Sequence, residues 1–210
     1  KDGPLSQYLN ALWFALFGVS LDTIIWANLV LLVALCVLVY ALFARAFGHF
    51  TATLAVLVQL TVFSFSQYTR VANYNYVCPY AQEQTHGLLL AVLMIFCLGE
   101  CARQGRARLA GLAGLALGLT SLTKAELAMP ALAAALLGLG LVGLTRARDA
   151  APLRIVLLAF GAGVATPVVA CVALLALQMP LATAFRGAAG NWIHLRGDIL
   201  DYEFYRAGMG

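Results

Sequence analysis

Three apolar stretches in the sequence are long enough to cross a lipid bilayer as single helices. They cover residues 23–44, 125–144 and 155–178. A helix needs about 20 residues to span a hydrocarbon core of roughly 30 Å. Because lipid offers the backbone no hydrogen-bonding partner, a crossing chain must be helical or form a closed barrel. These stretches therefore predict an all-α fold, a polytopic transmembrane helical bundle.

Three shorter apolar stretches lie between the long ones, at residues 51–65, 87–99 and 109–122. Polar residues bound each of them, and short helices still cross a membrane where neighbouring protein shields their ends. Glycine and alanine recur in 109–122 and 125–144, as they do in closely packed membrane helices. The sequence therefore predicts about six spans within residues 22–178.

The segments that flank the predicted spans are more polar. Residues 1–21 are too short and too polar at their start to span, so we expect an interfacial amphipathic helix there. Its apolar face contains Leu9, Leu12, Trp13, Leu16 and Phe17. Residues 179–210 are predicted to form a loop on the same side. We interpret residues 1–210 as a single transmembrane domain and as a fragment of a longer chain, since the sequence opens on Lys1 without Met.

The composition agrees with a membrane protein and argues against nucleic-acid binding. Hydrophobic residues make up 63% of the chain and charged residues 10%, whereas soluble domains carry roughly 25% charged residues. No basic cluster alternates with aromatic residues, so no nucleic-acid partner is expected. Cys97 and Cys101 lie one helical turn apart with no His nearby in sequence, and we interpret them as packing residues rather than metal ligands.

The distribution of arginine predicts the orientation in the membrane. If the N-terminus lies outside, three short inner connections hold Arg45, Arg103, Arg106, Arg108, Arg146, Arg148 and Arg154. The positive-inside rule places such connections in the cytoplasm. Most acidic residues then fall on the outer side, namely Asp2, Asp22, Glu83, Glu126, Asp198, Asp201 and Glu203. The polar residues of a functional site are therefore expected on the outer face.

The stretch "YAQEQTHG" places two ionisable residues at the start of a predicted span. Glu83 and His86 are three residues apart and share one face of a helix that begins there. They are candidates for an acid/base or substrate-binding pair. The alternative is a carboxylate stabilised by the helix dipole beside a hydrated histidine. A Glu-x-x-His pair also supplies two ligands for a divalent metal, although two ligands alone do not define a site.

Two further outer segments carry candidate substrate contacts. The tight turn "SLTKAELAMP" brings Lys124 and Glu126 to the outer surface, where a lysine suits a lipid phosphate or simply extends toward the headgroups. Tyr76 and Tyr80 belong to a tyrosine-rich loop at residues 66–85. Their rings are predicted either to anchor the membrane interface or to stack on a sugar.

Taken together, these segments resemble the integral-membrane glycosyltransferases of the GT-C fold, in the branch of protein O-mannosyltransferases and aminoarabinose transferases. The similarity is carried by "DGPLSQYLNALWFALFGVS", "LVYALFARAFG", the acidic position of "YAQEQTHG", and "AGLALGLTSLTKAE". The resemblance implies that a sugar passes from a polyprenyl-phosphate donor to a lipid, glycan or protein acceptor by an inverting displacement. It also implies an active site on the extracytoplasmic face of a bacterial inner membrane.

The resemblance also implies roles for individual residues. Glu83 matches the second outer acidic motif, although Gln84 follows it where the family usually has Pro. Asp2 lies beside the end of the first outer loop, and the family's principal catalytic aspartate would precede this chain. The catalytic candidates are Glu83 and Asp2. The substrate-binding candidates are Lys124, His86, Tyr76, Tyr80 and Glu126. No metal site is expected, and a divalent metal is the cofactor left open.

Two other classes of function remain open on the sequence. A transporter or lipid flippase predicts charged residues at mid-membrane and broken helices in paired repeats. In this sequence the charges collect at one predicted rim and no convincing repeat is seen, which favours the enzyme. A non-catalytic scaffold subunit is the third alternative. Membrane lipids are expected partners in every case.

Overall fold

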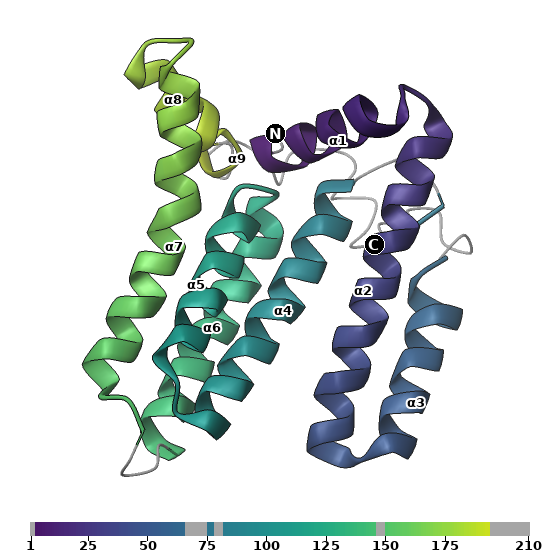
Figure 1. The fold of residues 1–210 in the computed structure, drawn as a ribbon, viewed down its shortest axis with the longest axis vertical. Coiled ribbons are helices and arrows are strands. Elements are labelled where there is room, and N and C mark those ends of the chain that lie inside the picture. Colours follow the sequence, from purple (N-terminus) through teal and green to yellow (C-terminus); the bar gives the residue numbers. More distant parts are fainter. Residues whose placement is uncertain (1–2, 66–74, 78–81, 146–149, 194–210) are drawn as a thin grey trace, which may run out of the picture.

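The computed structural model describes residues 3–65, 75–77, 82–145 and 150–193, and almost all of these residues are helical (Figure 1). The helical elements are α1 (Pro4–Phe17), α2 (Leu21–Phe47), α3 (His49–Val58), the π-helix η1 (Gln59–Phe63), α4 (Gln82–Gln104), α5 (Ala107–Ser121), α6 (Ala125–Thr145), α7 (Leu153–Ala176), α8 (Leu181–Ala188) and α9 (Gly190–Ile193). An isolated bridge pairs Phe65 with Asn75. The predicted all-α fold is confirmed.

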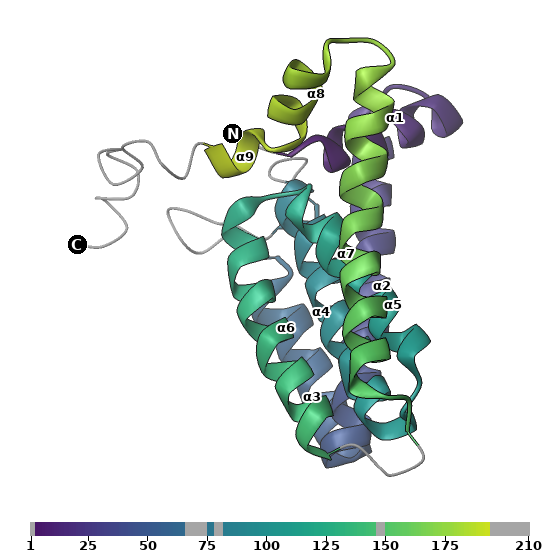
Figure 2. The same ribbon diagram turned by 90° about the vertical axis from the view of Figure 1, so that its left-hand side faces the viewer.

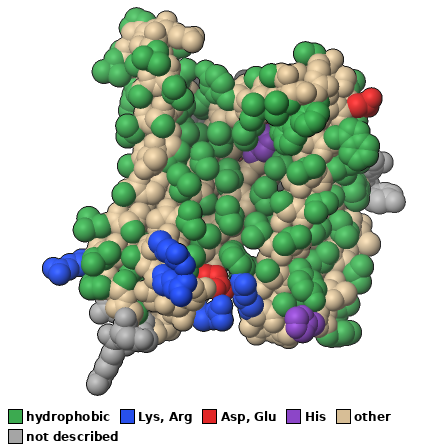
Figure 3. All heavy atoms as spheres, in the orientation of Figure 1, with side chains coloured by type: hydrophobic (Ala, Val, Ile, Leu, Met, Phe, Trp, Pro, Cys, Tyr) green, Lys and Arg blue, Asp and Glu red, His purple; other side chains and the backbone are tan. Residues whose placement is uncertain are grey.

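The bundle has two groups of helices, and α1 lies across one end of both (Figures 1 and 2). One group is the hairpin of α2 and α3, and the other contains α4 to α7. We call the end that carries α1 the α1 end; α2, α4 and α6 begin there. The opposite end is the arginine end, where basic side chains gather in Figure 3; it is defined by Arg45, Arg103, Arg106, Arg108 and Arg154.

Four helices are long enough and apolar enough to cross a membrane, namely α2, α4, α6 and α7. The continuous helix of α3 and η1, at His49–Phe63, and α5 are shorter. Large apolar side chains cover much of the outer surface (Figure 3), as expected where lipid replaces water. The prediction of about six spans thus corresponds to four full-length helices and two shorter ones.

Two helix boundaries differ from the predicted ones. The predicted span at 87–99 is only the apolar centre of α4, because polar residues at both of its ends are also helical. The predicted loop after residue 178 begins with α8 and α9. Ala184 and Ala188 lie one turn apart in α8 and are both buried, so one face of α8 packs against the protein. The sequence of this segment did not predict that face.

A proline, a serine cap and a glycine determine where the first helices begin and end. Pro4 occupies the first turn of α1, where a backbone N–H has no helical partner to lose. The Ser20 hydroxyl oxygen accepts the Thr23 N–H at 3.1 Å and caps α2. Gly48 adopts a φ of +89°, which other residues rarely tolerate, and lets the chain reverse between α2 and α3.

Small side chains allow α4, α5, α6 and α7 to pack closely. Their shared core consists of Met94, Cys97, Leu98, Ala113, Ala116, Leu117, Ala131 and Ala135. Between α5 and α7 the approach is closer still: a Cβ atom at Gly114 would collide with the Phe160 carbonyl, and one at Gly163 with the Gly111 carbonyl. Such glycine contacts replace the hydrophobic effect as the driving force for helix association in lipid.

The α2–α3 hairpin joins the larger group through apolar contacts with α4 and an ion-pair network at the arginine end. Arg45 of α2 pairs with Glu100 of α4 at 3.1 Å, and its guanidinium lies 4.5 Å from the centre of the Phe96 ring. Glu100 also accepts hydrogen bonds from Arg103, at 2.9 Å, and from Gln104. This nearly buried carboxylate is therefore fully paired, as a charge at a membrane boundary requires.

Candidate functional site

The α1 end gathers three helix N-termini beneath one covering helix. α2, α4 and α6 all begin there, and α1 packs on α2 and α4 (Figure 1). The first N–H groups of a helix have no carbonyl partner within the helix, and the helix dipole gives this end a partial positive charge. Helix N-termini therefore favour anions such as phosphate.

Buried and half-buried polar side chains at the α1 end connect α1 and α2 to the first turns of α4. His86 Nδ1 lies 3.0 Å from the Ser6 hydroxyl, and both side chains are buried. Asn10 donates a hydrogen bond to Gln82 at 2.7 Å. The Thr85 hydroxyl donates a hydrogen bond to the side-chain amide oxygen of Asn28 in α2 at 3.3 Å. Buried polar contacts of this kind hold helices in one register.

The start of α4 also lies against the α5–α6 turn, which we define as residues 121–124. A Cβ atom at Gly87 would lie 2.7 Å from the Thr123 hydroxyl and 2.7 Å from the Leu127 side chain. A methyl group at position 87 would displace these side chains, so α4 passes close to the turn at this point. The first turn of α4, which carries Glu83, is thereby placed beside the turn that carries Lys124.

Lys124 and Glu126 lie together at this turn. The Lys124 ammonium is 3.5 Å from a Glu126 carboxylate oxygen, and their side chains are 20% and 44% exposed. Glu83 is half-buried in the first turn of α4. The structure therefore brings Glu83, Lys124 and Glu126 to the same end of the bundle, as the sequence predicts.

His86 and Tyr76 are more enclosed than the sequence suggests. His86 is only 4% exposed and contacts α1, so the alternative of a hydrated histidine is wrong. Tyr76 has no exposed surface and packs with Leu32 and Leu35 of α2. Its ring has no free face for a sugar, so sugar stacking by Tyr76 is not part of the function proposed below. Asp2 and Tyr80 lie outside the described residues.

Several polar residues of this end were not identified from the sequence, among them Ser6, Asn10 and Asn28. Asn28 is 1% exposed, and its Nδ2 has no hydrogen-bond partner among the described residues. A signal for it exists, because a lone asparagine inside the apolar run 23–44 is costly in lipid and usually has a packing or functional role. Ser6 and Asn10 offer no comparable signal, since polar residues are ordinary in an interfacial helix.

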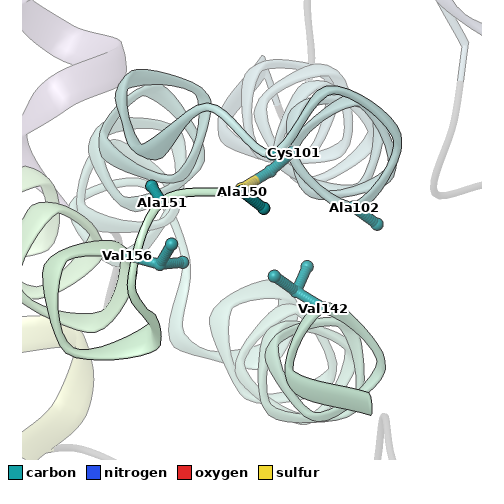
Figure 4. A pocket seen from close by; sticks show the side chains of 7 residues that line it. Cys101, Ala102, Val142, Ala150, Ala151 and Val156 are labelled. Atoms are coloured by element: carbon teal, nitrogen blue, oxygen red, sulfur yellow. The ribbon is translucent and has the colours of Figure 1, made fainter. Parts of the chain in front are cut away.

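A small pocket lies at the arginine end, away from the polar residues of the α1 end. It is lined by Cys101, Ala102, Gly105, Val142, Ala150, Ala151 and Val156 (Figure 4). These residues are small or apolar and carry no charge, so the pocket has no group to hold a sugar or a phosphate. Within the described part of the chain, no three His, Cys, Asp or Glu side chains are grouped to hold a metal ion.

Comparison with known proteins gives one match. A sequence profile of the dolichyl-phosphate-mannose-protein mannosyltransferase family matches residues 1–172. Neither the curated proteins nor the solved structures with which the chain was compared include a match. The matched region contains α1 to α6 and most of α7, and so includes the whole polar arrangement from Ser6 to Glu126. The chain therefore belongs to the dolichyl-phosphate-mannose-protein mannosyltransferase family, whose members are membrane glycosyltransferases of the GT-C type.

Proposed function

We propose that this protein transfers a sugar from a polyprenyl-phosphate donor to a lipid, glycan or protein acceptor at the α1 end of the bundle. Family membership supports a membrane glycosyltransferase. The proposed location rests on one observation, the close approach of Gly87 to Thr123. Because of it, the first turn of α4, with Glu83, lies near the α5–α6 turn, with Lys124. A carboxylate and a cation are thereby available at the same end of the membrane-spanning helices.

The reaction is a displacement at the anomeric carbon of the donor sugar. An acceptor hydroxyl oxygen attacks this carbon, the bond from the carbon to the phosphate oxygen breaks, and its electron pair leaves with the polyprenyl phosphate. Glu83 accepts the proton of the acceptor hydroxyl as general base. The configuration of the sugar inverts because attack and departure take place on opposite faces.

Negative charge grows on the phosphate as it leaves. Lys124 is suited to stabilise it, because its ammonium lies at the N-terminus of α6, where the helix dipole also favours an anion. Glu126 holds the Lys124 ammonium at 3.5 Å and so limits the positions that this flexible side chain samples. The polyprenyl tail would remain in the lipid around the bundle.

The arginine distribution supports an extracytoplasmic location for this chemistry. Arg45, Arg103 and Arg154 lie at the end opposite α1. By the positive-inside rule that end faces the cytoplasm, which leaves the α1 end on the outer side. A lipid-linked donor is the form of activated sugar that suits this side, because its tail keeps it in the membrane.

The test measures sugar transfer by the full-length protein in proteoliposomes, with polyprenyl-phosphate donors that carry a radiolabelled hexose or pentose. Glu83→Gln should lower turnover by about tenfold or more, the usual scale for a positioned acid or base. Lys124→Ala should weaken donor use by a similar factor. The matched controls are Asp22→Asn and Arg186→Ala, which remove an exposed charge of the same sign at the same end.

Three results would contradict the proposal. One is full activity of Glu83→Gln at both saturating and limiting donor. Another is equal loss of activity in the control variants, since that would indicate a general charge effect. The third is movement of the lipid between leaflets with no cleavage of the sugar–phosphate bond, which would identify a flippase.

A further inference from the structure

The α5–α6 turn receives hydrogen bonds from two distant parts of the chain. At the C-terminus of α5, three consecutive carbonyl oxygens accept donors from outside the helix. The Thr123 carbonyl accepts the Gly3 N–H at 2.6 Å, and the Leu122 carbonyl accepts the Leu5 N–H at 3.1 Å. The Ser121 carbonyl accepts the indole N–H of Trp192 at 3.1 Å.

These hydrogen bonds satisfy carbonyl oxygens at the C-terminus of α5. The last carbonyls of a helix have no partner within it, and an unpaired carbonyl near lipid is costly. Short caps or water usually satisfy them. Here the segment that enters α1 and the short helix α9 do so, although Trp192 lies 71 residues from Ser121 in sequence.

Glycine is the only residue type that fits at position 3. A Cβ atom at this position would collide with the carbonyl oxygen of Leu122. The clash involves backbone, which cannot move away as the end of a flexible side chain can. Any side chain at position 3 would therefore push the entry of α1 off the turn.

Lys124 directly follows these three anchored carbonyls. On its other side, its own carbonyl accepts the first two hydrogen bonds of α6, from Leu127 N at 3.2 Å and Ala128 N at 3.1 Å. The backbone of Lys124 is thus held from both directions. Only the side-chain rotamers remain to be selected, and the Glu126 carboxylate restricts those.

We propose that Gly3 and Trp192 are positioning residues that hold the α5–α6 turn, and with it Lys124, in place for the phosphate of the donor. The role assigned to the donor rests on the function proposed above. The anchoring of Lys124 does not, because it follows from the hydrogen bonds and from the lack of space at Gly3.

The experiment uses two variants with matched controls in the full-length protein. Gly3→Ala displaces the entry of α1, and Trp192→Phe removes the indole N–H while keeping an aromatic ring. The controls are Gly161→Ala, where a Cβ atom meets nothing within 4 Å, and Trp26→Phe, whose ring is 68% exposed on α2. Both controls make the same chemical change away from the turn.

The first readout is the rate at which a membrane-impermeant amine reagent modifies Lys124, measured by mass spectrometry of its peptide. Lys124 is one of only two lysines in the sequence, so its signal is easily separated. Loss of one hydrogen bond should raise the rate by about fivefold, through more frequent opening of the turn. The control variants should label at the wild-type rate.

The second readout is the Michaelis constant for each substrate of the transfer reaction. Both variants should raise KM for the polyprenyl-phosphate sugar and leave KM for the acceptor unchanged. A merely structural defect would lower the amount of active protein and leave both constants as they were.

The outcomes separate this inference from the proposed function. Unchanged Lys124 labelling in Trp192→Phe would overturn the inference, and this variant decides the matter if Gly3→Ala fails to fold. Faster labelling in the variants, and not in the controls, supports it. If labelling rises but polyprenyl-phosphate sugar does not protect Lys124 in the wild-type protein, the anchoring stands and the proposed role of Lys124 in donor binding fails.

Discussion

Lys124 occupies a position that the helix dipole by itself disfavours. It precedes the first residue of α6, where the partial positive charge of the helix opposes a cation by about 0.3 to 1 kcal/mol. Glu126 in the first turn follows the opposite rule and is favoured there. The Glu126 carboxylate, 3.5 Å from the Lys124 ammonium, offsets this cost, and the phosphate of the proposed donor would offset it further.

The contact between Ser6 and His86 should couple α1 to α4 energetically. Both side chains are buried, and the bond joins residues 80 apart in sequence. In a double-mutant cycle with Ser6→Ala and His86→Ala, the stabilities should depart from additivity by about 1 kcal/mol. Thermal or denaturant unfolding of the protein in detergent micelles measures this coupling.

A control for this cycle pairs Ser6→Ala with Thr53→Ala in α3. Thr53 is exposed and donates a hydrogen bond to the carbonyl of His49 in its own helix. Effects of distant sites should add to within about 0.5 kcal/mol. Additivity in the Ser6 and His86 cycle as well would show that this contact does not stabilise the packing of α1 on the bundle.

At the scale of the elements, the seam between α5 and α7 depends on glycine. Gly163 faces the backbone of Gly111, whereas Gly161 of the same helix faces open space. Gly163→Ala should therefore destabilise the protein by about 1 to 3 kcal/mol, as overpacking does in close-packed interiors. The melting temperature in lipid nanodiscs measures the effect.

The neighbouring position provides the comparison. Gly161→Ala adds the same methyl group to the same helix and removes a flexible residue, so stability should stay unchanged or rise slightly. Equal destabilisation by both substitutions would point to a general intolerance of α7 to alanine. In that case the close approach of α5 and α7 would not be the cause.

At the scale of the whole molecule, the two ends of the bundle should differ in accessibility across the membrane. Val19, next to α1, and Leu144, near the arginine end, are both 84% exposed. In a cysteine-free background and intact cells, an impermeant maleimide should modify Val19→Cys and not Leu144→Cys. After permeabilisation both sites should react. Labelling of Leu144→Cys alone in intact cells would reverse the orientation and move the α1 end to the cytoplasm.

The sequence by itself determined the class of fold and which end of the bundle carries the arginines. A helix in lipid satisfies its backbone hydrogen bonds within one segment, so the length and apolarity of that segment are enough to predict it. The arginines at one end and the "TKAE" turn at the other are local features of the same kind. For this reason the all-α bundle, the arginine end and the placement of Glu83, Lys124 and Glu126 were all within reach of sequence reasoning.

Only the tertiary structure decided which surfaces meet. The burial of His86 against Ser6, the enclosure of Tyr76 and the convergence of Gly3 and Trp192 on one turn involve segments far apart in the chain. Periodicity shows that a helix has a face but not which neighbour covers it, because that depends on the packing of side chains from several helices at once. A glycine in sequence looks the same whether it faces open space, as Gly161 does, or another backbone, as Gly163 does, and the difference exists only when both helices are in place.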